Sequence, residues 1–219
     1  LAPDTPAWQA IAIRERQLAA ACAETAPERI APFYRDDARS YPDYQPALRG
    51  TGAISAYRPA IAARRQCLAL TYRPAEMLDL GSAVLVRGGV HEQRRRTDGT
   101  VEEIDAKYLH LWRREPDGRL RLQAESQGYN APYAHPADDY VADLPASATS
   151  PAAAPPDGIA GELAVLNARI AHGVKSHDTV ERLSVYADDA VIMPFADTPK
   201  AGMAVIAPYL SAYVARGSG

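Results

Sequence analysis

Hydrophobic residues recur at roughly helical spacing in the first part of the chain. Ile11, Leu18 and Cys22 fall on one face of a helix that Asp4 or Thr5 can cap. A second short helix is predicted to end near residue 34, and a third over 51–65. A proline inside the third predicts a kink, because it removes one backbone hydrogen bond.

Beyond residue 66 the pattern changes to the alternation that is typical of strands. The predicted strands cover 67–80, 82–96, 101–115 and 119–130, and the turn pairs Leu80-Gly81, Asp98-Gly99 and Asp117-Gly118 separate them. Asp-Gly between alternating runs is a strong hairpin signal. Helices followed by an antiparallel meander predict an α+β fold in which the helices cover one face of the sheet.

The sequence repeats itself after a stretch rich in proline and alanine. "YRDDARSYPDYQPALRG" begins at Tyr34, and "YADDAVIMPFADTPKAG" begins at Tyr186, at a constant offset without a gap. Self-similarity at a fixed long period predicts a duplicated unit. The predicted organisation is a complete domain over 1–134, a linker over 135–158, and the N-terminal helical half of a second copy over 159–219. Either this second copy is truncated or its sheet lies in a continuation of the chain.

Composition narrows the classes of partner. The chain has 219 residues, of which 47% are hydrophobic, and a formal net charge of −3. This balance predicts neither nucleic acid nor a membrane as partner. Cys22 and Cys67 do not have the spacing of a metal site, and we expect no metal and no cofactor. The chain starts at Leu1, which fits a trimmed chain or a mature protein after removal of a signal peptide, so both the cytoplasm and the periplasm stay open.

Two predicted helices are followed by "YxDDA", a proline, a glycine and "IxxY", and then by a curved meander. In this order of its elements the chain resembles the nuclear-transport-factor-two-like superfamily. SnoaL-like cyclases and ketosteroid isomerases are the most similar branches. The resemblance implies a cone in which a bent sheet wraps around the N-terminal helices and encloses an apolar cavity. It also implies assembly through the outer face of the sheet, as a homodimer or as a pseudo-dimer within the duplicated chain.

The turn pairs predict which side chains point into the cone. A two-residue Asp98-Gly99 turn places Arg87 opposite His110. A two-residue Asp117-Gly118 turn places Glu125 opposite His110, and a Pro116-Asp117 loop shifts the pairing by two and keeps the same face. A three-residue loop that ends in a bulged Gly118 would turn Leu122 and Ala124 to that face instead. The resemblance favours the first pairing for this second hairpin.

The site hypothesis is a polar row within an aromatic cavity. We expect Arg87, His110 and Glu125 to be catalytic, with a substrate-binding wall that comprises Tyr41, Tyr57, Tyr108, Trp112, His91, Gln123 and Gln127. A carboxylate beside an imidazole, with an arginine for an anionic oxygen, suits proton transfer next to a carbonyl. The alternative interpretation is that these groups only satisfy one another.

The sequence departs from the ketosteroid isomerases at the positions that the resemblance assigns to their chemistry. Tyr41 stands where they have a general base, Leu18 where a helix tyrosine donates to the oxyanion, and His110 where an aspartate assists that tyrosine. Asp43 is an alternative base. The sequence therefore predicts a pocket for a small, partly apolar molecule, with isomerase- or lyase-type proton transfer or, alternatively, ligand binding or assembly without catalysis.

Overall fold

The computed structural model describes residues 2, 5–24, 27–144 and 157–216. The chain divides into two compact units. Unit 1 comprises Leu1–Thr149 with Phe195–Thr198, and unit 2 comprises Ser150–Pro194 with Pro199–Gly219.

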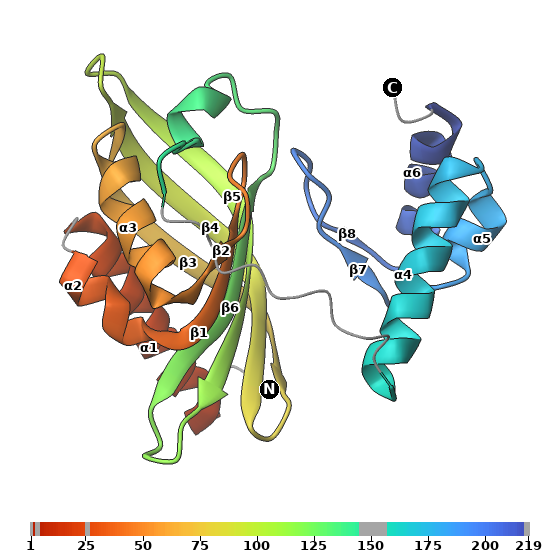
Figure 1. Ribbon diagram of the computed structural model, residues 1–219, viewed down its shortest axis with the longest axis horizontal. Coiled ribbons are helices and arrows are strands. Elements are labelled where there is room, and N and C mark those ends of the chain that lie inside the picture. The colour runs from red at the N-terminus through yellow and green to blue at the C-terminus, as the bar shows by residue number, and fades with distance from the viewer. Residues whose placement is uncertain (1, 3–4, 25–26, 145–156, 217–219) are drawn as a thin grey trace. The chain divides into compact units, whose positions relative to one another are not determined.

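Unit 1 is an α+β fold, as the sequence predicts. Helices α1 (Pro6–Ala23), α2 (Pro27–Ile30) and α3 (Gly50–Ala62), with the short 3-10 helix η1 (Ala31–Phe33), lie on one face of a six-stranded sheet (Figure 1). The strands run in the order β2 (Leu48–Arg49), β1 (Tyr34–Pro42), β6 (Leu120–Tyr129), β5 (Val101–Arg114), β4 (Ala83–Arg96) and β3 (Arg65–Asp79). The β1–β6 pair is parallel and the other pairs are antiparallel.

Local signals explain where α1 begins and how it packs. The Thr5 side chain accepts a hydrogen bond of 3.3 Å from the Trp8 backbone N–H, and Pro6 occupies the first turn. Ile11 and Leu18 are at most 1% exposed and face the sheet side of the helix. The predicted stripe is thus the face that joins the core.

A bulge in β3 bends the sheet where β3 pairs with β4. The pairing of β3 with β4 shifts between Pro74 and Glu76, opposite Gly88. A Cβ added at Gly88 would lie 2.2 Å from the carbonyl oxygen of Arg73, a distance that no side chain tolerates. Gly88 is therefore required by the close approach of the two backbones.

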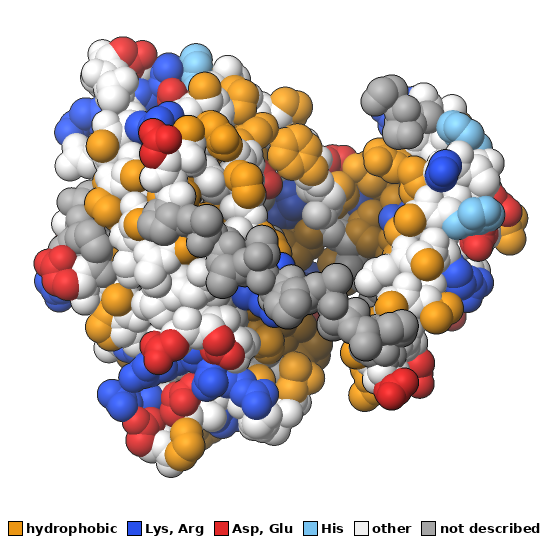
Figure 2. Space-filling view, viewed as in Figure 1, with side chains coloured by type: hydrophobic (Ala, Val, Ile, Leu, Met, Phe, Trp, Pro, Cys, Tyr) orange, Lys and Arg blue, Asp and Glu red, His pale blue; other side chains and the backbone are white. Residues whose placement is uncertain are grey.

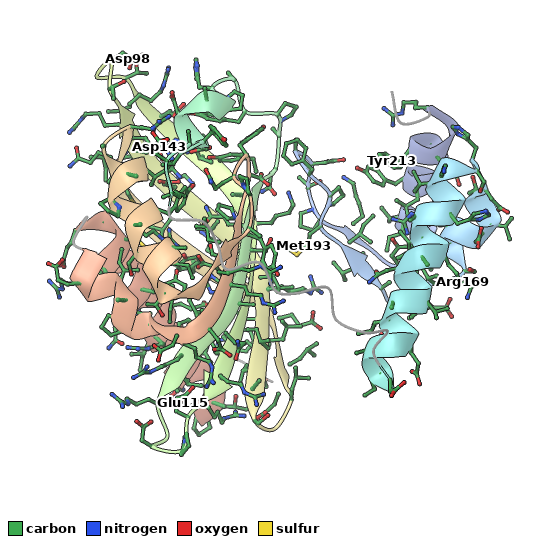
Figure 3. The ribbon with its side chains drawn as sticks, viewed as in Figure 1. Asp98, Glu115, Asp143, Arg169, Met193 and Tyr213 are labelled. Atoms are coloured by element: carbon green, nitrogen blue, oxygen red, sulfur yellow. The ribbon has the colours of Figure 1, made fainter. Side chains whose placement is uncertain are left out.

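Residues beyond β6 close one end of the sheet. We call 130–144 the strap; it contains the 3-10 helix η2 (Pro136–Asp139). Its Asp139 is 2% exposed and its Val141 is 8% exposed. Figure 3 labels Asp98 and Glu115 at opposite ends of the sheet. The predicted linker 135–158 therefore begins too early, because residues 135–144 belong to unit 1. Its residues 145–156 lie outside the described ones.

Charged side chains gather at one end of the sheet. At the end that Glu115 marks, Figure 2 shows charged side chains of both signs gathered together. The ion pairs Arg35–Glu115 and Arg114–Asp79, the latter at 2.8 Å, form there. These exposed pairs contribute little to stability.

Unit 2 contains α4 (Ile159–Lys175), α5 (Thr179–Leu183), the hairpin β7 (Val191–Ile192) with β8 (Lys200–Ala201), and α6 (Met203–Arg216). Asp178 caps α5 by accepting a 2.9 Å hydrogen bond from the Glu181 N–H. None of the helices among the described residues of either unit is both long and apolar enough to cross a bilayer.

Replacement of Gly88 by alanine tests the bend. We expect Gly88→Ala to lower the free energy of unfolding by roughly 3 kcal/mol, because its Cβ forces the two backbones apart. Both tryptophans, Trp8 and Trp112, belong to unit 1, so tryptophan fluorescence in urea reports the unfolding of this unit. The matched control is Gly52→Ala in α3, where a Cβ meets nothing within 4 Å and should stabilise by about 0.5–1 kcal/mol. Equal effects of the two substitutions would contradict the account of the bend.

Candidate functional site

The β5–β6 hairpin brings His110 and Glu125 opposite each other, which confirms the predicted pairing. The loop differs from the prediction. It has three residues, 116–118, with Gly118 at φ +80°, and it pairs Trp112 with Leu122. A bulge at Gln123 then inserts one residue and restores the parity at Glu125. Gln123 lies in this bulge and hydrogen-bonds to Asp37, away from the site.

The β4–β5 hairpin has the same kind of loop without a bulge to compensate for it. Gly99 adopts φ +85°, Arg96 pairs with Thr100, and Val86 takes the predicted place of Arg87 opposite His110. The predicted register is therefore wrong by one residue, and every side chain of β4 is turned over. Arg87 lies on the outer face and pairs with Glu76.

His91 shares that outer face. Its ring nitrogens lie 2.9 Å from Asp105 Oδ1 and 2.8 Å from Glu103 Oε2. The hydrogen bond to Asp105 is the main reason why the pKa of His91 is raised. Neither His91 nor Arg87 joins His110 and Glu125 in the cone.

Glu125 sits at the centre of a buried polar network. It accepts hydrogen bonds from Tyr34 Oη at 2.8 Å, Ser40 Oγ at 2.6 Å and Arg58 Nη2 at 2.9 Å. Burial favours the neutral acid, but Arg58, followed by His110 and the hydroxyl donors Ser40 and Tyr34, outweighs it and holds the pKa of Glu125 below its usual range. Glu125 is thus an anchored carboxylate and a weak base.

Arg58 joins this network from α3. Its Nη2 also donates to Tyr34 Oη at 2.9 Å. Burial would lower the pKa of Arg58, but Tyr34 and Glu125 raise it well above the usual value, so the guanidinium stays charged. Its Nε is a buried donor for which the described residues provide no acceptor.

His110 belongs to a separate pair below this network. Its Nδ1 lies 3.0 Å from Glu15 Oε1, and Tyr108 Oη donates to Glu15 Oε2 at 2.9 Å. The side chains of His110 and Glu15 are each 2% exposed. Tyr72 and Trp112 make edge-on ring contacts with His110, at centroid distances of 4.9 Å and 5.9 Å. His110 is enclosed by protein groups.

A cavity that we call cavity A opens beside Glu125. Its volume is about 50 Å³, roughly four times the minimum that one water molecule needs. Strands β1, β3 and β6, the residue after β1, helix α3 and the strap supply its lining, which comprises Ser40, Pro42, Asp43, Tyr57, Arg58, Ile61, Arg65, Glu125, Gln127, Gly128, Tyr129 and Asp139. Of the predicted site residues, Tyr57, Glu125 and Gln127 line it. His110, Tyr108 and Trp112 do not, and Tyr41 is 41% exposed outside it.

Asp43 differs from the other acidic groups of cavity A. Its Oδ2 accepts a 2.7 Å hydrogen bond from the Tyr129 N–H, and a Cβ at Gly128 would lie 3.2 Å from its carboxyl oxygens. Burial raises the pKa of Asp43, and the hydrogen bond from Tyr129 offsets only part of that effect. Asp43 is therefore a stronger base than an exposed aspartate.

A second ion-pair cluster ties the strap to the sheet. Arg65 bridges Glu92 Oε1 at 2.5 Å and Asp139 Oδ1 at 2.6 Å. Burial would lower the pKa of Arg65, but the two carboxylates raise it well above the usual value. Asp139 thus lines cavity A with its carboxylate already paired with Arg65.

The sequence analysis did not identify the helix residues that pair with His110 and Glu125. Glu15 and Arg58 each share a helical stripe with apolar residues of the core: Glu15 lies between Ile11 and Leu18, and Arg58 between Ile54 and Ile61. A charged residue in an apolar stripe is the signal that could have found both. Nothing local in the sequence indicates that Asp139 would fold back over the cavity. The described residues hold no group of three or more potential metal ligands.

Comparison with known proteins identifies the fold. No protein-family model matches the chain, and no curated protein sequence does. A ketosteroid isomerase-like protein from Erwinia carotovora atroseptica is similar at TM-score 0.52 and 15% identity, over 57% of this chain and 96% of that one. ActVI-ORFA from Streptomyces coelicolor is similar at TM-score 0.50 and 13% identity, over 57% and 98%. An NTF2-like superfamily protein from Salmonella enterica matches at TM-score 0.49 and 14% identity, over 57% and 91%. The two structures at TM-scores of 0.52 and 0.50 carry the comparison, and at these identities the likeness extends to the fold alone.

Removal of the Glu125 charge tests the network. We expect Glu125→Gln to lower the free energy of unfolding by about 3–5 kcal/mol at pH 7, because it leaves the buried Arg58 charge unpaired. The folded-state pKa of Glu125 is lowered. Its contribution is therefore present above the unfolded pKa of about 4.3 and is lost as the pH falls through the folded value.

The matched control is Glu76→Gln, which breaks the outer pair with Arg87. The Glu76 side chain is 41% exposed, so we expect a cost below about 1 kcal/mol. Adding Arg58→Met to Glu125→Gln should recover part of the loss, since no unpaired charge remains. Equal costs for Glu125→Gln and Glu76→Gln in urea titrations would contradict the network.

Proposed function

We propose that unit 1 binds a small carbonyl compound in cavity A and moves a proton next to the carbonyl. One observation carries the proposal: Arg58 Nε is a buried, charged donor without an acceptor among the described residues, and Arg58 lines a cavity that Asp43 also lines. Buried donors are almost always satisfied, so a ligand oxygen is the natural acceptor. The fold supports a small-molecule module of this kind.

The proton transfer follows from the two groups. The Asp43 carboxylate takes a proton from the carbon next to the carbonyl, and the electron pair moves onto the carbonyl oxygen. Arg58 stabilises the resulting enolate, because a charged donor in a water-poor site interacts strongly with developing negative charge. In a ketone with a double bond between its β- and γ-carbons, the enolate electrons then re-form the carbonyl and shift that double bond into conjugation. The γ-carbon takes the proton back from Asp43, which completes an isomerisation without any cofactor.

The sequence hypothesis assigned catalysis to His110, Glu125 and Arg87. It is less well supported than Asp43 with Arg58. Glu125 has a lowered pKa and three donors, His110 is enclosed, and Arg87 lies on the outer face. In our proposal Glu125 positions Arg58, and the His110–Glu15 pair supports the packing behind it.

Asp43→Asn tests the proposed base. We expect a rate 10²–10⁴ times lower, measured as conversion of 3-cyclohexen-1-one to 2-cyclohexen-1-one and as deuterium uptake into 2-butanone. The asparagine oxygen can still accept from the Tyr129 N–H, so the fold should persist. In the parent protein the rate should fall as the pH drops through the Asp43 pKa, which lies above the usual aspartate value.

Asp37→Asn is the control, because Asp37 pairs with Arg35 outside cavity A. Full activity of Asp43→Asn would exclude Asp43 as the base. Binding of 2-butanone without exchange or turnover in the parent protein would favour a ligand-binding module without catalysis.

We propose further that unit 2 is a partial second copy of the N-terminal half. Val191 pairs with Ala201, and Arg39 pairs with Arg49, at the same offset of 152 residues that relates the two sequence copies. Tyr44 and Ala196 adopt positive φ at this offset too. An experimental structure in which Val191 pairs with another residue would contradict the duplication.

Assembly through the sheet is the second candidate function. Leu78, Leu85, Leu111 and Ala124 are paired in one row across four strands of the outer face. Such an apolar row is typical of an association surface. The pseudo-dimer within the chain is the alternative form of this assembly.

Leu85→Arg tests this assembly by sedimentation equilibrium. We expect the parent chain to form a dimer and Leu85→Arg to weaken it at least tenfold, because a charge enters the apolar row. Leu80→Arg, in the neighbouring turn and off the row, should leave the dimer intact. A parent chain that stays monomeric at every concentration would contradict the homodimer.

A further inference from the structure

A second cavity adjoins cavity A on the side of α1. This cavity B also has a volume of about 50 Å³, and its lining comprises Cys22, Ile30, Arg58, Ile61, Ala62, Arg65, Cys67, Leu70, Glu92 and Gln127. Four residues line both cavities and form the wall between them: Arg58, Ile61, Arg65 and Gln127.

The two cavities differ in chemistry. The residues that line only cavity A include Ser40, Asp43 and Asp139. Those that line only cavity B are apolar or weakly polar apart from Glu92, whose charge is taken up by Arg65 at 2.5 Å. Burial raises the pKa of the Cys67 thiol to about 12, so it is a neutral, weakly polar group.

Gln127 is the part of the wall that can move. Ion pairs fix the two arginines: Arg58 to Glu125, and Arg65 to Glu92 and Asp139. The described residues form no hydrogen bond with the Gln127 side chain, although its backbone is held in β6 opposite Tyr108. A rotamer change at Gln127 therefore breaks no hydrogen bond to the described residues, whereas movement of either arginine would break an ion pair.

We propose that cavities A and B are two halves of one site, with Gln127 as the gate between them. The site takes a small molecule with a carbonyl head and an unbranched apolar tail. The head lies in cavity A at Arg58, and a tail of about three further methylene groups extends past Gln127 into cavity B. This inference rests on the proposed function and names the class of ligand for the same site.

A series of 2-alkanones tests it, because the head stays constant while the tail grows. Each buried methylene should tighten binding about fourfold, from 2-butanone up to about 2-heptanone, with no further gain beyond. Methyl NMR locates the ligand in the full chain: the Ile61 methyl signals should move with every member of the series, since Ile61 lines both cavities. The Ile30 signals, from cavity B alone, should move only with the longer ketones.

Two variants change the tail compartment in opposite directions. Ala62→Leu fills cavity B. It should weaken the binding of 2-heptanone at least tenfold and leave the binding of 2-butanone unchanged. Gln127→Ala removes the gate and should tighten the binding of 2-heptanone severalfold. Ala63→Leu is the matched control, because Ala63 is exposed, follows Ala62 in the chain and lines neither cavity.

The outcomes separate this inference from the proposed function. Binding of 2-butanone with an affinity that stays flat along the series, and with unmoved Ile30 signals, would overturn the two-cavity site alone. Equal effects of Ala62→Leu and Ala63→Leu on 2-heptanone would overturn it as well. Absence of any shift at Ile61 with every ketone would overturn both proposals.

Discussion

The buried ion pair between Arg58 and Glu125 is the constraint on which the site depends. It joins α3 to β6, and through Tyr34 and Ser40 it also joins β1. Removing two charges from water costs several kcal/mol per ion, and only a nearly complete set of hydrogen bonds offsets that cost. Glu125 has such a set. Arg58 lacks one partner among the described residues, at Nε, and that single open position is where a ligand can add binding energy.

The curvature of the sheet determines which side chains face this pair. Gly88 lets β3 and β4 approach closely at the bend, and the bulge at Gln123 sets the parity of β6. The strap then closes the end of the cone through Asp139, which Arg65 holds. The result is a small enclosure in which one carboxylate is anchored, one has a raised pKa, and a charged donor lies on the same wall. This division between an anchored acid and a stronger base is what proton transfer requires.

Much of the fold could be predicted from the sequence, because periodicity and turn residues are local signals. The helix beginning at Pro6 and the four-strand meander followed from them, whereas the pairing of His110 with Glu125 was chosen among alternatives by the family resemblance. The register at Arg87 could not be predicted in this way, because Asp-Gly fits both a two-residue turn and a three-residue loop with glycine at positive φ. A difference of one residue between these loops turns every side chain of the strand to the other face. The predicted pairing of Glu125 with His110 was correct, although the loop was not. The three-residue loop shifts the register of β6 by one residue, and the bulge at Gln123 shifts it back. Contacts between distant segments, such as Glu15 with His110 or Asp139 with Arg65, depend on packing that no local pattern encodes.

The central claim is that Arg58 Nε is an open donor for a ligand oxygen in the cavity that contains Asp43. NMR of the Arg58 Nε–Hε group, with and without 2-butanone, tests it most directly. The account predicts that saturating ketone moves this proton resonance downfield and slows its exchange with water, while the Arg35 Nε–Hε signal, which arises outside the cavity, does not change. An Arg58 resonance that is identical with and without the ketone would contradict the account.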